Sequence, residues 1–218
     1  MRLFTSRLTV RAWLRALVSL VLVPSLTAGE LKWHDVPSAR WADLPMAEPG
    51  KAGFTSLPPA VTGILFTNVL RDDRSVTNRN LLSGSGVALG DVDGDGWCDL
   101  YFCGLDNPNR LYRNRGNWTF EEITDSAGVA CPNQDSTGAA LADIDGDGDL
   151  DLLVNSLGGG TRIFENDGKG RFTEITDRAG VRSRTGSTSM ALADVDGNGT
   201  LDLYVTNFRR GTFKQLEI

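Results

Sequence analysis

The chain has 218 residues, with 22 lysine or arginine and 28 aspartate or glutamate side chains, and its formal net charge is −6 at pH 7. Such an acidic balance argues against a nucleic-acid-binding protein, because those proteins neutralise phosphates with clustered basic residues.

Residues 1–28 are predicted to be a secretory signal peptide. Four arginines precede the apolar run of residues 16–26, and Thr-Ala-Gly follows it, an order typical of a cleavable signal. A run of about 11 residues is shorter than the roughly 20 of a membrane-spanning helix. Cleavage would remove the four arginines and change the net charge from −6 to −10. We expect a secreted or periplasmic protein without a membrane span; an uncleaved membrane anchor is the alternative.

Residues 29–52 contain several prolines and no periodicity, and are interpreted as a linker. Residues 54–64 then resemble the end of the repeats that follow later in the chain. In a closed propeller the N-terminal strand often completes the last blade, so we expect residues 53–57 to form such a strand.

Three repeats are predicted over residues 84–130, 136–182 and 187–218, the last of them truncated. Each complete repeat holds four short runs of β-favouring residues separated by Gly, Asn and Asp. The turn dipeptides Gly116-Asn117 and Asp167-Gly168 predict a hairpin between the third and fourth runs. Four strands per repeat of this length are typical of a propeller blade. The predicted fold is therefore all-β, a partial β-propeller of two complete four-stranded blades plus partial ones; a β-solenoid is the alternative.

Each repeat contains one nine-residue acidic loop, at residues 91–99, 143–151 and 194–202, and the first residues of the loops lie 52 (143 − 91) and 51 (194 − 143) positions apart. Side-chain oxygens at positions 1, 3, 5 and 9 converge when the glycines of the loop let the backbone coil tightly. An oxygen-only ligand set selects Ca²⁺ or Mg²⁺ over Zn²⁺, and several carboxylates without a phosphate favour Ca²⁺.

Position 7 is expected to contribute its backbone carbonyl oxygen, and position 9 to close the ligand shell. The predicted metal ligands are Asp91, Asp93, Asp95, Trp97 and Asp99; Asp143, Asp145, Asp147, Asp149 and Asp151; and Asp194, Asp196, Asn198, Thr200 and Asp202. The third site should be the weakest, because Asn198 replaces an acid. Solvated Asp/Gly turns without metal are the alternative. An EF-hand is excluded, because position 12 lacks the required glutamate.

The cysteines are Cys98, Cys103 and Cys131. Because an exported protein can form disulfides, we expect Cys103 to pair with Cys131, since Cys98 lies inside the first acidic loop. Three unpaired thiols are the alternative.

The phrase Val87-Ala-Leu-Gly-Asp-Val-Asp-Gly-Asp-Gly96 resembles the FG-GAP (VCBS) repeats of integrin α-subunit propellers. Together with Leu111-Tyr-Arg-Asn114 and the Phe-x-x-Ile-Thr-x-x-Ala-Gly-Val phrases, it is more similar to secreted proteins related to cartilage acidic protein. The resemblance covers about residues 54–207. It implies a seven-bladed propeller with Ca²⁺ in its loops and adhesion or matrix-like roles. An ASPIC/UnbV-type domain often follows in that family and is not found in this sequence.

We therefore expect a secreted calcium-binding repeat protein that acts as an extracellular interaction or adhesion-type module, with an unknown extracellular protein or glycan as partner. It is expected to be the N-terminal part of a longer protein. No catalytic residue is predicted, because the one histidine, His34, lies in the predicted linker. The alternatives are the propeller part of an extracellular hydrolase or lyase, and a fragment without independent function.

Overall fold

The computed structural model describes residues 33–36, 39–42, 54–181 and 185–207. The chain divides into two compact units, Met1–Phe54 and Thr55–Ile218. The predicted signal peptide, most of the predicted linker and residues 208–218 lie outside the described residues. In the first unit, β1 (Trp33–Val36) and β2 (Ala39–Ala42) form an antiparallel hairpin, in a segment for which the sequence indicated no strand.

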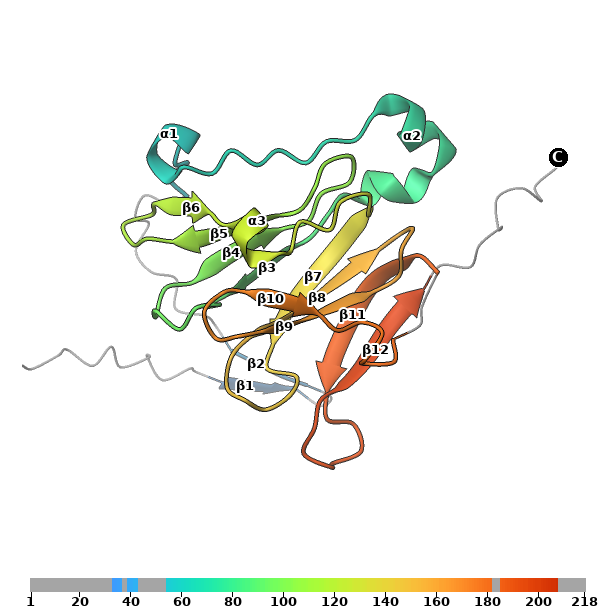
Figure 1. Cartoon of the computed structure of the whole chain (residues 1–218). Coiled ribbons are helices and arrows are strands. Elements are labelled where there is room, and N and C mark those ends of the chain that lie inside the picture. The colour runs from blue at the N-terminus through green and yellow to red at the C-terminus, as the bar shows by residue number, and fades with distance from the viewer. Residues whose placement is uncertain (1–32, 37–38, 43–53, 182–184, 208–218) are drawn as a thin grey trace, which may run out of the picture. The chain divides into compact units, whose positions relative to one another are not determined.

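The first blade is a four-stranded antiparallel sheet in the second unit (Figure 1). Its strands in chain order are β3 (Val87–Gly90), β4 (Asp99–Phe102), β5 (Arg110–Asn114) and β6 (Phe120–Glu122). Each strand pairs with the next one along the chain. The backbone N–H of Arg115 donates to the carbonyl of Thr119 over 2.7 Å and closes the predicted hairpin turn.

The second blade repeats this arrangement with β7 (Ser136–Ala142), β8 (Asp151–Ser156), β9 (Arg162–Asn166) and β10 (Phe172–Glu174). All six residues of β8 are buried, because the strand lies within its sheet and both faces of the sheet are covered. The predicted turn between β9 and β10 is closed by the N–H of Asp167, which donates to the carbonyl of Arg171 over 3.1 Å. The predicted four-stranded blades are therefore confirmed.

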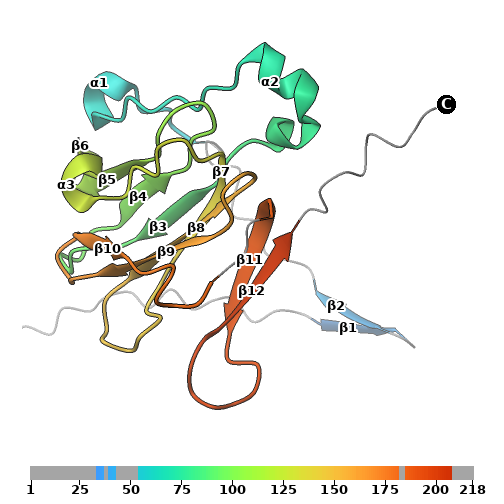
Figure 2. The same ribbon diagram turned by 45° about the vertical axis from the view of Figure 1, so that its right-hand side comes forward.

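A third, two-stranded sheet consists of β11 (Ser187–Ala193) and β12 (Asp202–Asn207). The first strands of the three sheets lie beside one another, with β7 between β3 and β11 (Figure 2). This is the arrangement of neighbouring blades around a propeller axis, and it confirms the prediction of a partial propeller.

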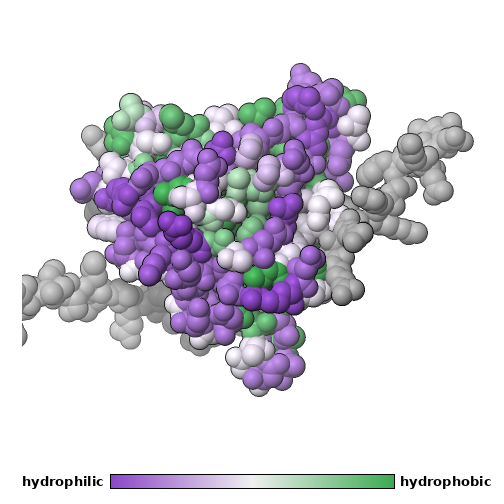
Figure 3. All heavy atoms as spheres, viewed as in Figure 1, coloured by the Kyte–Doolittle hydropathy of each residue, from purple (hydrophilic) through white to green (hydrophobic). Residues whose placement is uncertain are grey.

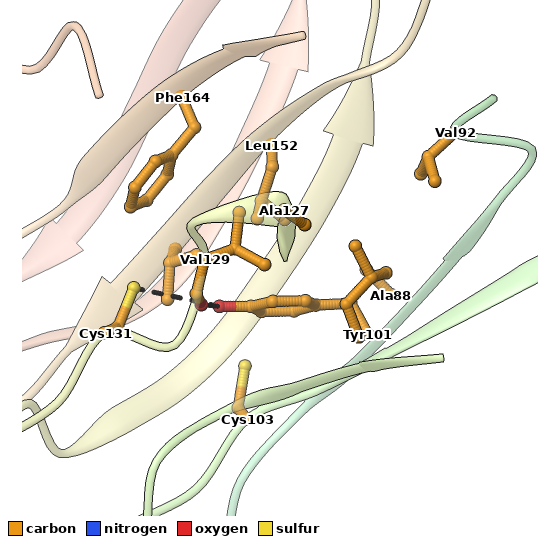
Figure 4. Close-up of a cluster of buried hydrophobic side chains, with 11 residues drawn as sticks. Ala88, Val92, Tyr101, Cys103, Ala127, Val129, Cys131, Leu152 and Phe164 are labelled. Carbon is orange, nitrogen blue, oxygen red and sulfur yellow. Dashed lines mark hydrogen bonds between the residues drawn. The ribbon is translucent and has the colours of Figure 1, made fainter. Parts of the chain in front are cut away.

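The main hydrophobic core fills the space between the first two blades (Figure 4). Tyr101 is fully buried, and its hydroxyl donates to the carbonyl oxygen of Val129 over 2.8 Å. Leu152 and Phe164 contribute to the same core from the second blade. The segment after β6, which carries the Ala-Gly-Val phrase, is thus held between one blade and the next.

Cys103 and Cys131 also belong to this core, and both are free thiols, as is the exposed Cys98. The expected Cys103–Cys131 disulfide is therefore wrong, and the alternative of three unpaired thiols describes the structure. Burial raises the pKa of Cys103 to about 12 and also raises that of Cys131. Both thiols consequently stay protonated at neutral pH and pack as small hydrophobic side chains.

Among the described residues, four short helical segments accompany the sheets, and none of them was predicted from the sequence. They are α1 (Pro59–Thr62), α2 (Asp72–Thr77), the 3₁₀ helix η1 (Arg79–Ser83) and α3 (Thr124–Ala127). Segments of four to six residues are too short to display a helical period. No helix among the described residues has the length and apolar character needed to cross a membrane.

α1 and α3 occupy equivalent places on successive blades. Each ends at a left-handed glycine; a Cβ on Gly63 would lie 2.7 Å from the carbonyl oxygen of Phe120, and one on Gly128 would lie 3.3 Å from that of Phe172. The segment at residues 59–64 therefore contacts the first blade in the same way as the end of the first repeat contacts the second blade. Residues 54–57 form no strand, so their expected addition to a last blade remains a prediction.

Candidate metal centres

The three acidic loops connect the first and second strands of the three sheets, and all three leave the lower ends of the sheets in Figure 1. The loop between β11 and β12 protrudes at the bottom of Figure 3, where hydrophilic side chains gather. The repeat thus places chemically equivalent loops at one edge of successive blades.

In each loop the carboxylates of positions 1, 3 and 9 form a cluster whose oxygen atoms lie within 4.8 Å of one another. The clusters are Asp91, Asp93 and Asp99; Asp143, Asp145 and Asp151; and Asp194, Asp196 and Asp202. Nine of the fifteen predicted ligands are therefore brought together, in three sets with the same loop positions.

Position 1 organises the loop backbone. The carboxylate of Asp91 accepts hydrogen bonds from the N–H groups of Gly94, over 2.9 Å, and Gly96, over 2.8 Å. These glycines have φ values of +71° and +87°, a conformation that side chains disfavour. Asp143 and Asp194 accept the equivalent bonds in the other loops. The glycines predicted from the sequence thus let the backbone coil around the first carboxylate.

Position 9 joins the loop to the rest of the blade. Asp99 is fully buried, and its two oxygens accept the N–H groups of Val92, over 2.9 Å, and Asn114, over 2.7 Å. Asp151 accepts the same pair of bonds in the second blade. Burial raises the pKa of both carboxyls, while these bonds oppose the rise. Each oxygen keeps a further lone pair, so position 9 can hold the fold and also ligate a cation.

The position 5 carboxylates of the first two loops, Asp95 and Asp147, lie outside the clusters. The Oδ1 atom of Asp95 accepts the N–H of Trp97 over 2.9 Å, and Asn198 makes the same contact with Thr200 over 2.8 Å. Asp147 does so in the second loop, over 3.1 Å. In this geometry position 5 shapes the turn. Ligation by position 5, and by the backbone carbonyl of position 7, remains a prediction.

Asp149, at position 7 of the second loop, has a carboxylate whose negative charge is not compensated by a nearby cation among the described residues. Burial, together with repulsion from the neighbouring carboxylates of Asp147, Asp151 and Asp145, raises the pKa of its carboxyl to about 6. Its Oδ1 atom is buried and has no hydrogen-bond partner. A cation in this loop would relieve the repulsion among its carboxylates, and an all-oxygen donor set suits a hard divalent ion. The second loop therefore fits Ca²⁺.

The first loop differs from the second through a basic residue, Arg113, that was not singled out from the sequence. The Nε atom of Arg113 in β5 lies 2.6 Å from Oδ2 of Asp93. The repeat offset of 52 (166 − 114) places Glu165 at the matching position of β9, where it pairs with Arg178. The signal was present in the sequence as an Arg-to-Glu difference between otherwise matching phrases. The role of this difference became clear only from the distance between Arg113 and Asp93 in the structure.

Comparison with known families gives the same assignment. The profile of the FG-GAP-like repeat matches residues 91–154 and again residues 143–205, so the two matches together cover more than half of the chain. The chain belongs to the FG-GAP-like repeat family. Each match begins at the first aspartate of one FG-GAP loop and ends in the second strand of the next blade.

Three relatives are similar to this FG-GAP protein, and all carry the name cartilage acidic protein 1. The protein of Mus musculus is 32% identical over 128 residues, which are 57% of this chain and 20% of the relative. Those of Xenopus tropicalis and Homo sapiens are each 32% identical over 127 residues, again 57% of this chain. The matched segment thus spans about a fifth of the length of these relatives.

Proposed function

We propose that this FG-GAP protein is a secreted calcium-binding propeller protein that acts as an extracellular interaction or adhesion-type module. The observation that carries the proposal is the recurrence of one three-carboxylate cluster at the same place in three successive blades. A single acidic turn is common without metal, whereas a repeated ligand geometry favours repeated sites.

In this proposal the role of Ca²⁺ is structural. The three carboxylates of a cluster come from positions 1, 3 and 9 of one loop, and in the first two loops the last of them accepts a backbone N–H from β5 or β9. When bound, Ca²⁺ would neutralise carboxylates that otherwise repel one another. The loop and its two strands would then be stabilised as a unit.

Calorimetric titration of Ca²⁺ into the metal-free 218-residue chain tests the proposal, together with melting curves in Ca²⁺ and in EGTA. We expect two to three bound ions and a higher melting temperature with Ca²⁺. The matched control carries asparagine at position 3 of each loop, in place of Asp93, Asp145 and Asp196, and should bind none. Absence of binding heat together with identical melting curves would overturn the proposal.

Export and an extracellular partner are part of the same proposal. The signal-like pattern of residues 1–28 supports export, and the abundance of extracellular Ca²⁺ suits sites of modest affinity. The partner would be a protein or a glycan and not a nucleic acid, since the chain is acidic. N-terminal sequencing of the exported protein tests this part, with cleavage expected near Ala28 or Gly29. An intact N-terminus on a membrane-bound product would contradict it.

We also propose that the protein is not an enzyme. The buried thiols of Cys103 and Cys131 have raised pKa values and are poor nucleophiles. The position 9 carboxylates are engaged by backbone N–H groups, which supports a structural role. Hydrolysis of a glycan or phosphoester by the purified chain, lost in Asp143→Ala, would favour the hydrolase alternative.

A further inference from the structure

We propose that Arg113 is a built-in counter-cation of the first FG-GAP loop, and that it makes this loop bind Ca²⁺ more weakly than the second loop does. The inference rests on the proposed binding of Ca²⁺ and assigns a role to a residue outside the predicted ligand set. Arg113 would set the order in which the loops fill as the Ca²⁺ concentration rises.

The guanidinium of Arg113 is held from two sides. Its Nε atom lies 2.6 Å from Oδ2 of Asp93, a carboxylate whose side chain is only 9% exposed. Its Nη2 atom donates to the carbonyl oxygen of Lys169 over 3.5 Å, in the turn between β9 and β10 of the next blade. A Cβ placed on Gly170 in the same turn would lie 3.8 Å from Nη2. The cation thus lies between the first loop and the neighbouring blade.

This position has two opposing effects on a metal ion in the cluster. The ion pair fixes the orientation of Asp93, which saves the rotamer entropy of one short side chain. It also places a positive charge against one of the three clustered carboxylates, where a divalent cation is repelled across a poorly solvated gap. Repulsion is the larger effect, because it scales with both charges and acts within a few ångströms. Arg113 should therefore lower the affinity of the first loop.

The second loop has the opposite arrangement. Glu165 takes the place of Arg113 and forms its ion pair with Arg178. No salt bridge within the described residues joins a cation to Asp143, Asp145 or Asp151. The second loop also carries a fifth carboxylate, that of Asp149, where the first loop has Trp97. Its negative charge is left for a metal ion to neutralise.

Tb³⁺ luminescence reports mainly on the first loop. Tb³⁺ replaces Ca²⁺ in its sites, and its emission is excited by a nearby tryptophan. Trp97 occupies position 7 of this loop, whereas the other loops have Asp149 and Thr200 there. The Trp97 ring also lies beside the β5–β6 turn, 3.5 Å from a Cβ placed on Gly116. Displacement of Tb³⁺ by Ca²⁺ then gives the Ca²⁺ affinity of the first loop.

The test compares Arg113→Gln with the matched control Glu165→Gln in the full chain. We expect Arg113→Gln to raise the Ca²⁺ affinity of the first loop at least tenfold and to lower the melting temperature in EGTA. Glu165→Gln should leave the Tb³⁺ signal unchanged. If Arg113→Gln fails to fold, Glu165→Arg provides the reciprocal test, with a tenfold loss of affinity expected at the second loop by calorimetry.

An unchanged or reduced affinity in folded Arg113→Gln, or an unaltered second site in Glu165→Arg, would overturn the role of Arg113 while leaving Ca²⁺ binding intact. Absence of both Tb³⁺ luminescence and binding heat in the wild-type chain would instead overturn the proposed function, and this inference with it.

Discussion

The first and second FG-GAP loops have the same backbone scaffold and differ in their balance of charge. In both loops the carboxylate of position 1 accepts hydrogen bonds from glycine N–H groups. The carboxylate of position 9 accepts one N–H from position 2 of the loop and another from the asparagine that ends the third strand of the blade. Among the salt bridges of the described residues, an arginine pairs with the first cluster alone, whereas the second loop carries an additional carboxylate on Asp149. Backbone geometry and charge compensation are thus set by different residues of the same repeat.

The largest loss of stability should come from replacing the position 9 aspartate, whose hydrogen bonds both loops share. Replacing Asp99 or Asp151 by alanine leaves two backbone N–H groups without an acceptor and should cost about 3 kcal/mol of unfolding free energy in either loop. Urea unfolding of the metal-free chain measures this cost. Asp202→Ala in the open third sheet is the control and should cost less, because its solvated N–H groups can bind water. A large difference between the Asp99 and Asp151 variants would break the equivalence of the two scaffolds.

Substitutions at position 3 should have different effects on stability in the first and second loops. Asp93→Asn weakens the partly buried ion pair with Arg113 and should destabilise the metal-free chain by about 1 kcal/mol. Asp145→Asn removes one of several repelling carboxylates and should not destabilise it. Urea unfolding in EGTA compares the two variants. Equal losses of stability would mean that Arg113 does not compensate the first cluster.

The strongest pH dependence of stability among the three loops should come from the second loop. The pKa of Asp149 is raised from 3.8 to about 6 in the folded chain, so its ionisation opposes folding. Stability without metal should fall as pH rises from about 4 to about 6, and the penalty is complete above that range. Asp149→Asn should reduce this slope and stabilise the chain by about 0.5 to 1 kcal/mol at pH 7, a value reduced for solvent screening. Melting curves across this range check it, with Trp97→Asn as the matched control. An undiminished slope in Asp149→Asn would assign the titration to another group.

The smallest change in stability is expected at position 5 of the third loop. Asn198→Asp keeps the oxygen that accepts the N–H of Thr200, so the unfolding free energy should change by less than about 0.5 kcal/mol. The added charge should raise the Ca²⁺ affinity of this loop several-fold. Calorimetry measures the affinity, with Asp147→Asn in the second loop as the reverse change. No gain in affinity would indicate that position 5 only shapes the turn.

Features that depend on neighbours along the chain were predicted well from the sequence. The hairpin turns at Gly116-Asn117 and Asp167-Gly168 close as expected, and the acidic loops bring positions 1, 3 and 9 together. A repeated spacing of a few residues fixes such geometry locally. The short helices α2 and η1 were missed, because they are too short to show a period. The expected Cys103–Cys131 disulfide was wrong, because residue types alone do not tell a bonded pair from two thiols packed in one core.

By itself the sequence determined the blade, its four strands and the carboxylates that meet in each loop, because these follow from periodicity and from spacing within single loops. Only the tertiary structure decided which cluster is compensated. Arg113 and Asp93 lie on different elements, 20 residues apart (113 − 93), and Lys169 belongs to the next blade. Electrostatic compensation depends on the distance between charges in space, and folding alone brings these groups within reach of one another.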